Sequence, residues 1–86
     1  MKVTGAGKTK NVAGLVGMTV WAAKRVIGTA FFGRNDVPGG IFDGRLSAAA
    51  RMTIQTEADG VELDDGVTLT AEHDPITFVV AEQPGT

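Results

Sequence analysis

His73 and Ser47 are the only histidine and the only serine of the chain, and Asp74 directly follows His73. These are the residue types of a hydrolytic triad, in which a carboxylate orients the histidine and the histidine activates the serine. Adjacent residues in a tight turn point apart, however. The stretch Glu72-His73-Asp74-Pro75 is also good turn chemistry, since Asp caps its own turn and Pro fixes φ. We therefore expect a turn here, no catalytic residue, and a protein that is not an enzyme.

The stretch Gly5-Ala6-Gly7-Lys8-Thr9 contains part of the pattern of a phosphate-binding loop. That loop requires G-x-x-x-x-G-K-[ST] between a strand and a helix. Lys2 stands where the first glycine is needed, and no strand is expected before it. Residues 1–10 are small, basic and without apolar periodicity, so we expect a flexible basic arm and no cofactor site.

Four acidic residues gather around two expected turns: Asp59, Glu62, Asp64 and Asp65. Oxygen-rich loops can bind calcium, but the spacing D-x-[DN]-x-[DN]-G is absent. The chain has no cysteine, and thus no thiolate site for zinc or an iron–sulfur cluster. These residues are therefore expected to form a solvated acidic edge without a metal ion.

The charges are divided along the chain. All eight basic residues lie within residues 1–51, where only Asp36 and Asp43 oppose them, so this part carries a net charge of +6. Residues 52–86 hold eight acidic residues and no basic one, a net charge of −8. Such asymmetry bears on partners and association. It predicts that one half meets the other, within a subunit or between neighbouring copies.

Length and composition limit the chain further. Its 86 residues form one domain at most, with a thin stability margin and no disulfide to add to it. The apolar residues 12–32 contain Lys24-Arg25, which argues against a membrane span and against a signal peptide. We expect no secretion through a signal peptide, a single domain over residues 11–86, and stabilisation by assembly.

Residues 12–27 carry an apolar stripe at three- and four-residue spacing, which predicts a helix. Asn11 is a candidate N-cap, and Gly28 is a candidate stop signal. Alternation from Val16 to Ala22 leaves a pair of strands as the other interpretation. Residues 33–45 contain the glycines, proline and Asn-Asp pair of a loop.

The carboxy-terminal part predicts a four-stranded antiparallel meander over about 51–58, 61–63, 67–71 and 76–81. Asp59-Gly60 is a two-residue turn signal that pairs Thr56 with Leu63. A three-residue turn ending in Gly66 and a turn over residues 72–75 complete the meander. All three registers agree on one apolar face, made of Met52, Ile54, Ala58, Val61, Leu63, Val67, Leu69, Ala71, Ile76, Phe78 and Val80. The predicted fold is α+β, with the helix of residues 12–27 or a neighbouring subunit covering this face.

Trp21 lies off the helical stripe, beside Lys24 and Arg25. An off-stripe Trp is typical of an interface anchor, although a helix buried on two sides would also explain it. We expect the arm to contact an acidic patch of a neighbour. The residues predicted to bind a partner are Lys2, Lys8, Lys10, Trp21, Lys24, Arg25, Glu62, Asp64 and Asp65.

Taken over its whole length, this small, cysteine-free, Gly- and Thr-rich chain with an arm and a β-meander resembles the accessory structural proteins of tailed-phage particles, such as capsid decoration proteins. The resemblance rests on overall character and on no motif. It implies a virion location, or otherwise the cytoplasm, and binding to a capsid shell. The predicted function is a non-enzymatic structural subunit that contacts copies of itself, a larger assembly, or both.

Two other functions remain open from the sequence. The basic arm could make a small nucleic-acid-binding or regulatory module, but its three lysines lack interleaved aromatic residues and the whole chain is acidic, so nucleic acid is not the expected partner. Residues 12–32 could associate with a membrane surface, and vesicle co-sedimentation would test that. We expect no membrane partner.

Overall fold

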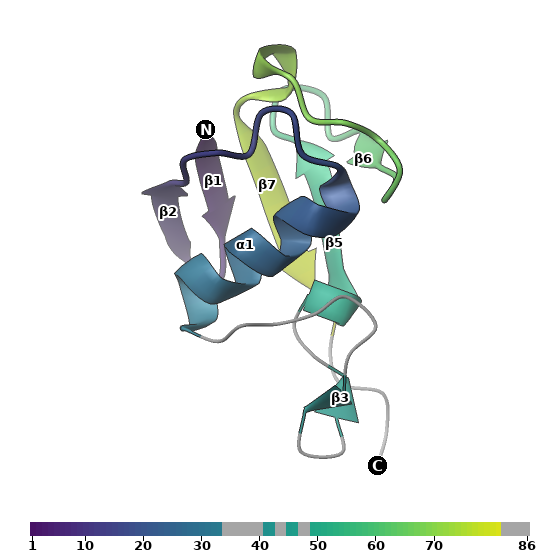
Figure 1. Ribbon diagram of the computed structural model, residues 1–86. Coiled ribbons are helices and arrows are strands. Elements are labelled where there is room, and N and C mark those ends of the chain that lie inside the picture. Colours follow the sequence, from purple (N-terminus) through teal and green to yellow (C-terminus); the bar gives the residue numbers. More distant parts are fainter. Residues whose placement is uncertain (34–40, 43–44, 47–48, 82–86) are drawn as a thin grey trace.

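The computed structural model describes residues 1–33, 41–42, 45–46 and 49–81. One helix crosses one face of a sheet, and buried side chains from the helix and the sheet form a single core (Figure 1). The strands are β1 Lys2–Gly5, β2 Lys8–Asn11, β3 Ile41–Phe42, β4 Arg45–Leu46, β5 Met52–Thr56, β6 Glu62–Leu63 and β7 Ile76–Val80. The helices are α1 Val20–Phe32 and the 3₁₀ turns η1 Ala49–Arg51 and η2 Ala71–His73.

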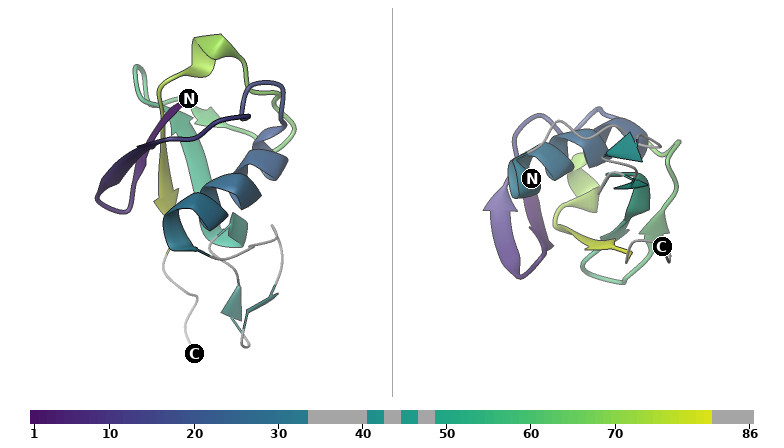
Figure 2. Two further views of the ribbon diagram at one scale, coloured as in Figure 1. Left: turned by 60° about the vertical axis from the view of Figure 1, so that its left-hand side comes forward. Right: turned by 90° about the horizontal axis from the view of Figure 1, so that it is seen from below.

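The main sheet has five strands in the order β2-β1-β7-β5-β6, and α1 lies across one of its faces (Figure 2). β1 runs parallel to β7, whereas the other neighbouring pairs are antiparallel. The predicted α+β class is confirmed, but the sheet is mixed and not a four-stranded antiparallel meander. Among the described residues, an amino-terminal hairpin is followed by α1, and the carboxy-terminal strand β7 takes the central place in the sheet. A fold of this kind does not determine function, so the function must be argued from the surface.

Residues 1–10 do not form the predicted flexible arm. β1 and β2 pair as a hairpin, and Val3 is fully buried opposite Ile76 of β7. A two-residue turn at Ala6-Gly7 joins the strands, with φ angles of 51° and 74°. Positive φ at both turn residues is the geometry of a type I′ turn, whose twist matches that of the flanking strands. The amino-terminal stretch is therefore an integral part of the sheet.

Ala6 is the one residue other than glycine with positive φ among those the structure describes. The left-handed conformation costs a residue with a Cβ about 1–2 kcal/mol, and Asn tolerates it better than Ala. We expect Ala6→Asn, which creates the preferred Asn-Gly turn, to stabilise the protein by about 1 kcal/mol. Urea unfolding followed by circular dichroism measures this change. An unchanged or lower midpoint would contradict the turn assignment.

The predicted helix of residues 12–27 begins too early. Thr19 is the N-cap, and its hydroxyl accepts a hydrogen bond from the Ala22 N–H at 3.2 Å. Gly14 and Gly17 precede the cap with φ angles of 82° and 94°, which excludes them from a right-handed helix. The helix ends at the left-handed Gly33 and not at the predicted Gly28, which is buried inside α1. The predicted N-cap Asn11 belongs to β2.

The predicted strand over residues 67–71 is wrong. This segment pairs instead with the residues that lead into α1: Leu69 N donates to Met18 O at 2.8 Å, and Gly17 N donates to Leu69 O at 2.8 Å. Thr19 and Thr68 form an isolated bridge. β7 is therefore free to pair directly with β5, over five residue pairs from Met52–Val80 to Thr56–Ile76.

β5 and β6 form the predicted hairpin, but its strands pair in a different register. Ile54 pairs with Leu63, two residues from the predicted Thr56–Leu63 pair. A shift of two keeps the same side chains on the same face. Ala58, Val61 and Ala71 were predicted on the apolar face but are exposed. The buried core consists of Val3, Val12, Leu15, Val20, Ala23, Ile27, Phe31, Met52, Ile54, Leu63, Leu69, Ile76 and Phe78.

The glycine-rich loop predicted over residues 33–45 lies mostly outside the described residues. Within it, β3 and β4 pair antiparallel, with Ile41 opposite Leu46 and Phe42 opposite Arg45.

Candidate functional site

One outer strand of the main sheet is basic. β2 carries Lys8 and Lys10, β1 beside it carries Lys2, and all three residues are exposed. The Lys10 ammonium donates to the Ala30 carbonyl at 2.8 Å and lies 5.4 Å from the centre of the Phe31 ring. It thus contacts the carboxy-terminal end of α1, where carbonyl dipoles favour a cation. We name Lys2, Lys8 and Lys10 the basic edge.

The opposite outer strand is acidic. β6 and its two flanking turns carry Asp59, Glu62, Asp64 and Asp65, which are all exposed and which we name the acidic edge. The four carboxylates were predicted to gather at a solvated edge, and they lie exposed around β6. Because β2 and β6 are the two outermost strands, the basic and acidic edges lie on opposite sides of the sheet (Figure 1).

Asp59 stabilises the turn between β5 and β6. Its carboxylate accepts hydrogen bonds from the Thr56 hydroxyl and, at 3.4 Å, from the Val61 N–H. These bonds favour the charged form and lower the pKa of Asp59 below its ordinary value. The stabilisation they provide is therefore present above the ordinary pKa and is lost as the pH falls through the lower folded-state pKa. This acid is ionised at neutral pH and contributes fully to the acidic edge.

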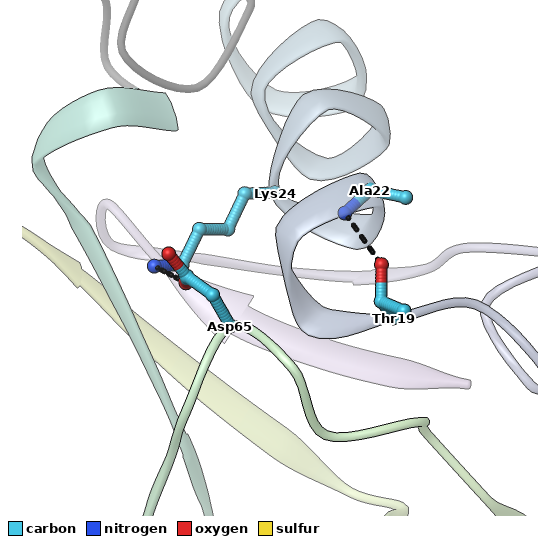
Figure 3. A network of polar contacts seen from close by, with 4 residues as sticks. All are labelled: Thr19, Ala22, Lys24 and Asp65. Carbon is cyan, nitrogen blue, oxygen red and sulfur yellow. Dashed lines mark hydrogen bonds and ion pairs between the residues drawn. The ribbon is translucent and has the colours of Figure 1, made fainter.

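Trp21 and Lys24 contact the acidic edge from α1, and Figure 3 shows the pair of Lys24 and Asp65. The Lys24 ammonium lies 2.6 Å from a carboxylate oxygen of Asp65, and the backbone N–H of Trp21 donates to the backbone carbonyl of Asp65 at 3.1 Å. The Lys24 side chain is 12% exposed, whereas the Trp21 residue is 44% exposed. Lys24 therefore holds the turn within the subunit, and Trp21 remains available to a partner.

Because Asp65 pairs with Lys24, we expect its substitution to lower stability more than the same substitution at the neighbouring Asp64. Asp65→Asn leaves a largely buried ammonium without its counter-charge, so we expect a loss of about 1 kcal/mol in unfolding free energy. Asp64→Asn, the matched control, removes an exposed charge and should change stability by less than about 0.5 kcal/mol. Urea unfolding of both variants measures the difference. Equal effects would show that the ion pair contributes nothing.

Arg25 lies on a different feature of α1 from Lys24. It lines a shallow, mainly apolar groove along the outer flank of α1, together with Met18, Ala22, Val26, Thr29 and Ala30. Ala22, Val26 and Ala30 follow at four-residue spacing and form one row on the surface of α1, and Met18 lies just before the Thr19 cap. The predicted helix of residues 12–27 ended before Thr29 and Ala30, so this groove was not predicted.

The triad residues have other roles in the fold. His73 Nδ1 accepts a hydrogen bond from the Thr70 N–H at 3.0 Å, and an Asp74 carboxylate oxygen accepts one from the Lys2 N–H at 3.0 Å. Ser47 lies outside the described residues. No group of three or more His, Asp or Glu side chains close enough to hold a metal ion occurs in the part of the chain that the structure describes.

Several exposed apolar side chains were not predicted as partner contacts. Val61 is 53% exposed beside the acidic edge, and Phe32 is 38% exposed at the carboxy-terminal end of α1. Val79 is 60% exposed, on the sheet face opposite the buried Phe78. No helix among the described residues is long and apolar enough to cross a membrane.

Searches with this chain against protein-family models, curated proteins and solved structures find no match. The main surface features of the described residues are two open sheet edges of opposite charge and a half-exposed tryptophan next to the acidic edge.

Proposed function

We propose that this chain is a non-enzymatic structural subunit that binds other protein subunits within a larger assembly. The observation that carries the proposal is the opposite charge of the two open sheet edges. Complementary charge steers protein partners together and fixes their relative position. Outer strands with unpaired backbone groups also offer a template for pairing with another chain.

Trp21 supports the proposal from a second direction. Tryptophan is enriched among the residues that dominate binding energy at protein interfaces. Here its side chain is partly exposed next to the acidic edge, with Val61 also exposed on the turn before β6. An apolar anchor beside charged groups is the usual composition of an interface core with a polar rim. The resemblance to capsid decoration proteins suggests a capsid shell as one such assembly.

The alternative of a nucleic-acid-binding module has weaker support. The lysines lie on an ordered hairpin, and the Lys10 ammonium is bound to the Ala30 carbonyl, which leaves fewer cations for phosphates. Binding to a duplex with a steep dependence on salt would favour this alternative.

Chemical cross-linking in the native source, followed by purification of the tagged chain, tests the proposed function. We expect the chain to be recovered with partner proteins or with further copies of itself in fixed proportion. Trp21→Ala should reduce this recovery, whereas Val79→Ala, which removes an exposed apolar side chain elsewhere, should not. Recovery of the chain alone, at its own mass, would overturn the proposal.

A further inference from the structure

The free side of β2 exposes two backbone positions. Met1 and Val12 exchange hydrogen bonds, at 3.0 Å from the Met1 nitrogen to Val12 O and at 2.9 Å from Val12 N to Met1 O. Bonded and non-bonded pairs alternate along an antiparallel ladder. With Lys10 opposite Val3 and Thr9 opposite Thr4, the N–H and C=O groups of Thr9 and Asn11 therefore point away from β1. These groups are available to a further strand.

The free side of β6 exposes one backbone position. Thr56 N donates to Val61 O at 3.1 Å, and Gln55 lies opposite Glu62 in the next pair. By the same alternation, the N–H and C=O groups of Glu62 point away from β5. The edge is short, and the exposed Val61 together with the carboxylates of the acidic edge surrounds it.

We propose that the β6 edge of one copy pairs with the β2 edge of a second copy, so that the sheet continues from subunit to subunit. This inference rests on the proposed function and names the partner as another copy of the chain. In a parallel pairing, the Glu62 N–H donates to the Thr9 carbonyl, and the Asn11 N–H donates to the Glu62 carbonyl. Glu62 then lies opposite Lys10 with both side chains on one face of the joined sheet, and Lys8 lies two residues along on the same face. Opposite charges on facing strands stabilise such a pair.

The charges favour this pairing over the two symmetric ones. Two β2 edges would bring the lysines of both copies together, and two β6 edges would bring their carboxylates together. Like charges on directly opposed strands are destabilising. The favoured contact is therefore heterologous: one copy of a pair keeps its β2 edge free, and the other keeps its β6 edge free. A contact of this type forms rings or open filaments.

The contact is small, because β6 has only two residues. Short edge strands limit uncontrolled pairing. Interfaces of small area are usually weak and transient. We therefore expect the purified chain to be monomeric when dilute and to associate at about 1 mM in low salt. Added salt should reverse the association because it screens exposed charges.

Charge reversal provides the test. Lys8→Glu and Glu62→Lys are expected to abolish association when each is introduced alone. The double variant with both changes restores opposite charges at the same two strands and should associate again. Glu72→Lys, on η2, changes the net charge by the same amount as Glu62→Lys and serves as the matched control. It should leave association unchanged.

Two measurements on the purified full chain complete the experiment. Sedimentation equilibrium reports the mass at low and high concentration, and amide NMR spectra report the residues involved. The proposal expects the Thr9, Asn11 and Glu62 amides to shift with concentration and to gain protection from hydrogen exchange. A monomer under all conditions overturns it, as does association that Glu62→Lys leaves intact or that the double variant fails to restore. A monomer that still copurifies with other proteins from the native source would refute the self-pairing alone and leave the proposed function standing.

Discussion

Phe78→Ala is expected to lower the free energy of unfolding by about 3–5 kcal/mol. Phe78 is 4% exposed and projects from the central strand β7 into the space between the sheet and α1. Its ring packs edge-on against Phe31, with centroids 4.8 Å apart, and against Phe32, with centroids 6.2 Å apart. Each such aromatic pair adds about 0.5–1.5 kcal/mol beyond the burial of area. Truncation to alanine therefore removes the contacts that join the end of α1 to the sheet.

The consequence for the whole molecule is large because the domain is small. Natural domains are stable by about 5–15 kcal/mol, and a chain of this length lies near the lower end. We expect Phe78→Ala to be partly unfolded at room temperature. Thermal and urea unfolding followed by far-ultraviolet circular dichroism measure the loss.

Val79→Ala is the matched control for this experiment. Val79 is the next residue of β7, but it is 60% exposed on the opposite face of the sheet. Its truncation should cost less than about 0.5 kcal/mol. Equal losses at the two positions would contradict the assignment of the two faces of β7.

The strands that the sequence predicted well are those in which alternation coincides with one buried face. Met52 and Ile54 of β5, and Ile76 and Phe78 of β7, are buried as the alternation predicted. Period-two patterns report such faces directly because successive side chains of a strand point to opposite sides. The pattern does not report which strands are neighbours, so the direct pairing of β5 with β7 was missed.

The amino-terminal hairpin was missed because its edge strand carries almost no apolar signal. β2 is exposed along its whole length, and Val3 is the one fully buried side chain of β1. The parallel contact of β1 with β7 joins residues more than 70 positions apart, such as Val3 and Ile76. Periodicity within a short segment does not indicate which strand, so far away in the sequence, the segment pairs with. The lysines were located correctly as a basic surface, but on an ordered strand.

The start of α1 was misplaced because the apolar stripe continues through the loop that precedes it. Val12 and Leu15 are buried, as the stripe predicted, but they reach the core from a loop. The helix starts after Thr19, which is its N-cap. Gly14 and Gly17 have positive φ angles and so lie before the helix. Glycine spacing was thus a better guide to the helix start than hydrophobic spacing.

Gly5→Ala is expected to destabilise the protein strongly, although it adds only one methyl group. A Cβ at Gly5 would lie 2.3–2.5 Å from three atoms of the Phe78 ring. Neither group can move easily, because β1 is hydrogen-bonded between β2 and β7, and Phe31 and Phe32 pack against the ring. Overpacking of this kind costs about 1–3 kcal/mol. The glycine that looked like part of a phosphate-binding loop is therefore required by an aromatic side chain.

A second substitution separates this clash from any other effect of losing the glycine. Phe78→Leu removes the ring atoms that the new methyl group would meet, so Gly5→Ala should cost much less in a Phe78→Leu background than in the native chain. The difference is a coupling free energy of about 1 kcal/mol or more in a double-mutant cycle. Urea unfolding of the four proteins supplies all the values.

Gly66→Ala is the matched control for the added methyl group. Gly66 has open space around the position of a Cβ, and its φ lies outside the left-handed region. Alanine there should be neutral or should stabilise by about 0.4–1 kcal/mol, since it restricts the unfolded chain. If Gly5→Ala behaved like Gly66→Ala, or if Phe78→Leu failed to reduce its cost, the close packing of β1 against the Phe78 ring would be wrong. The sheet would then have to tolerate a side chain at the one place where β1, β7 and the end of α1 converge.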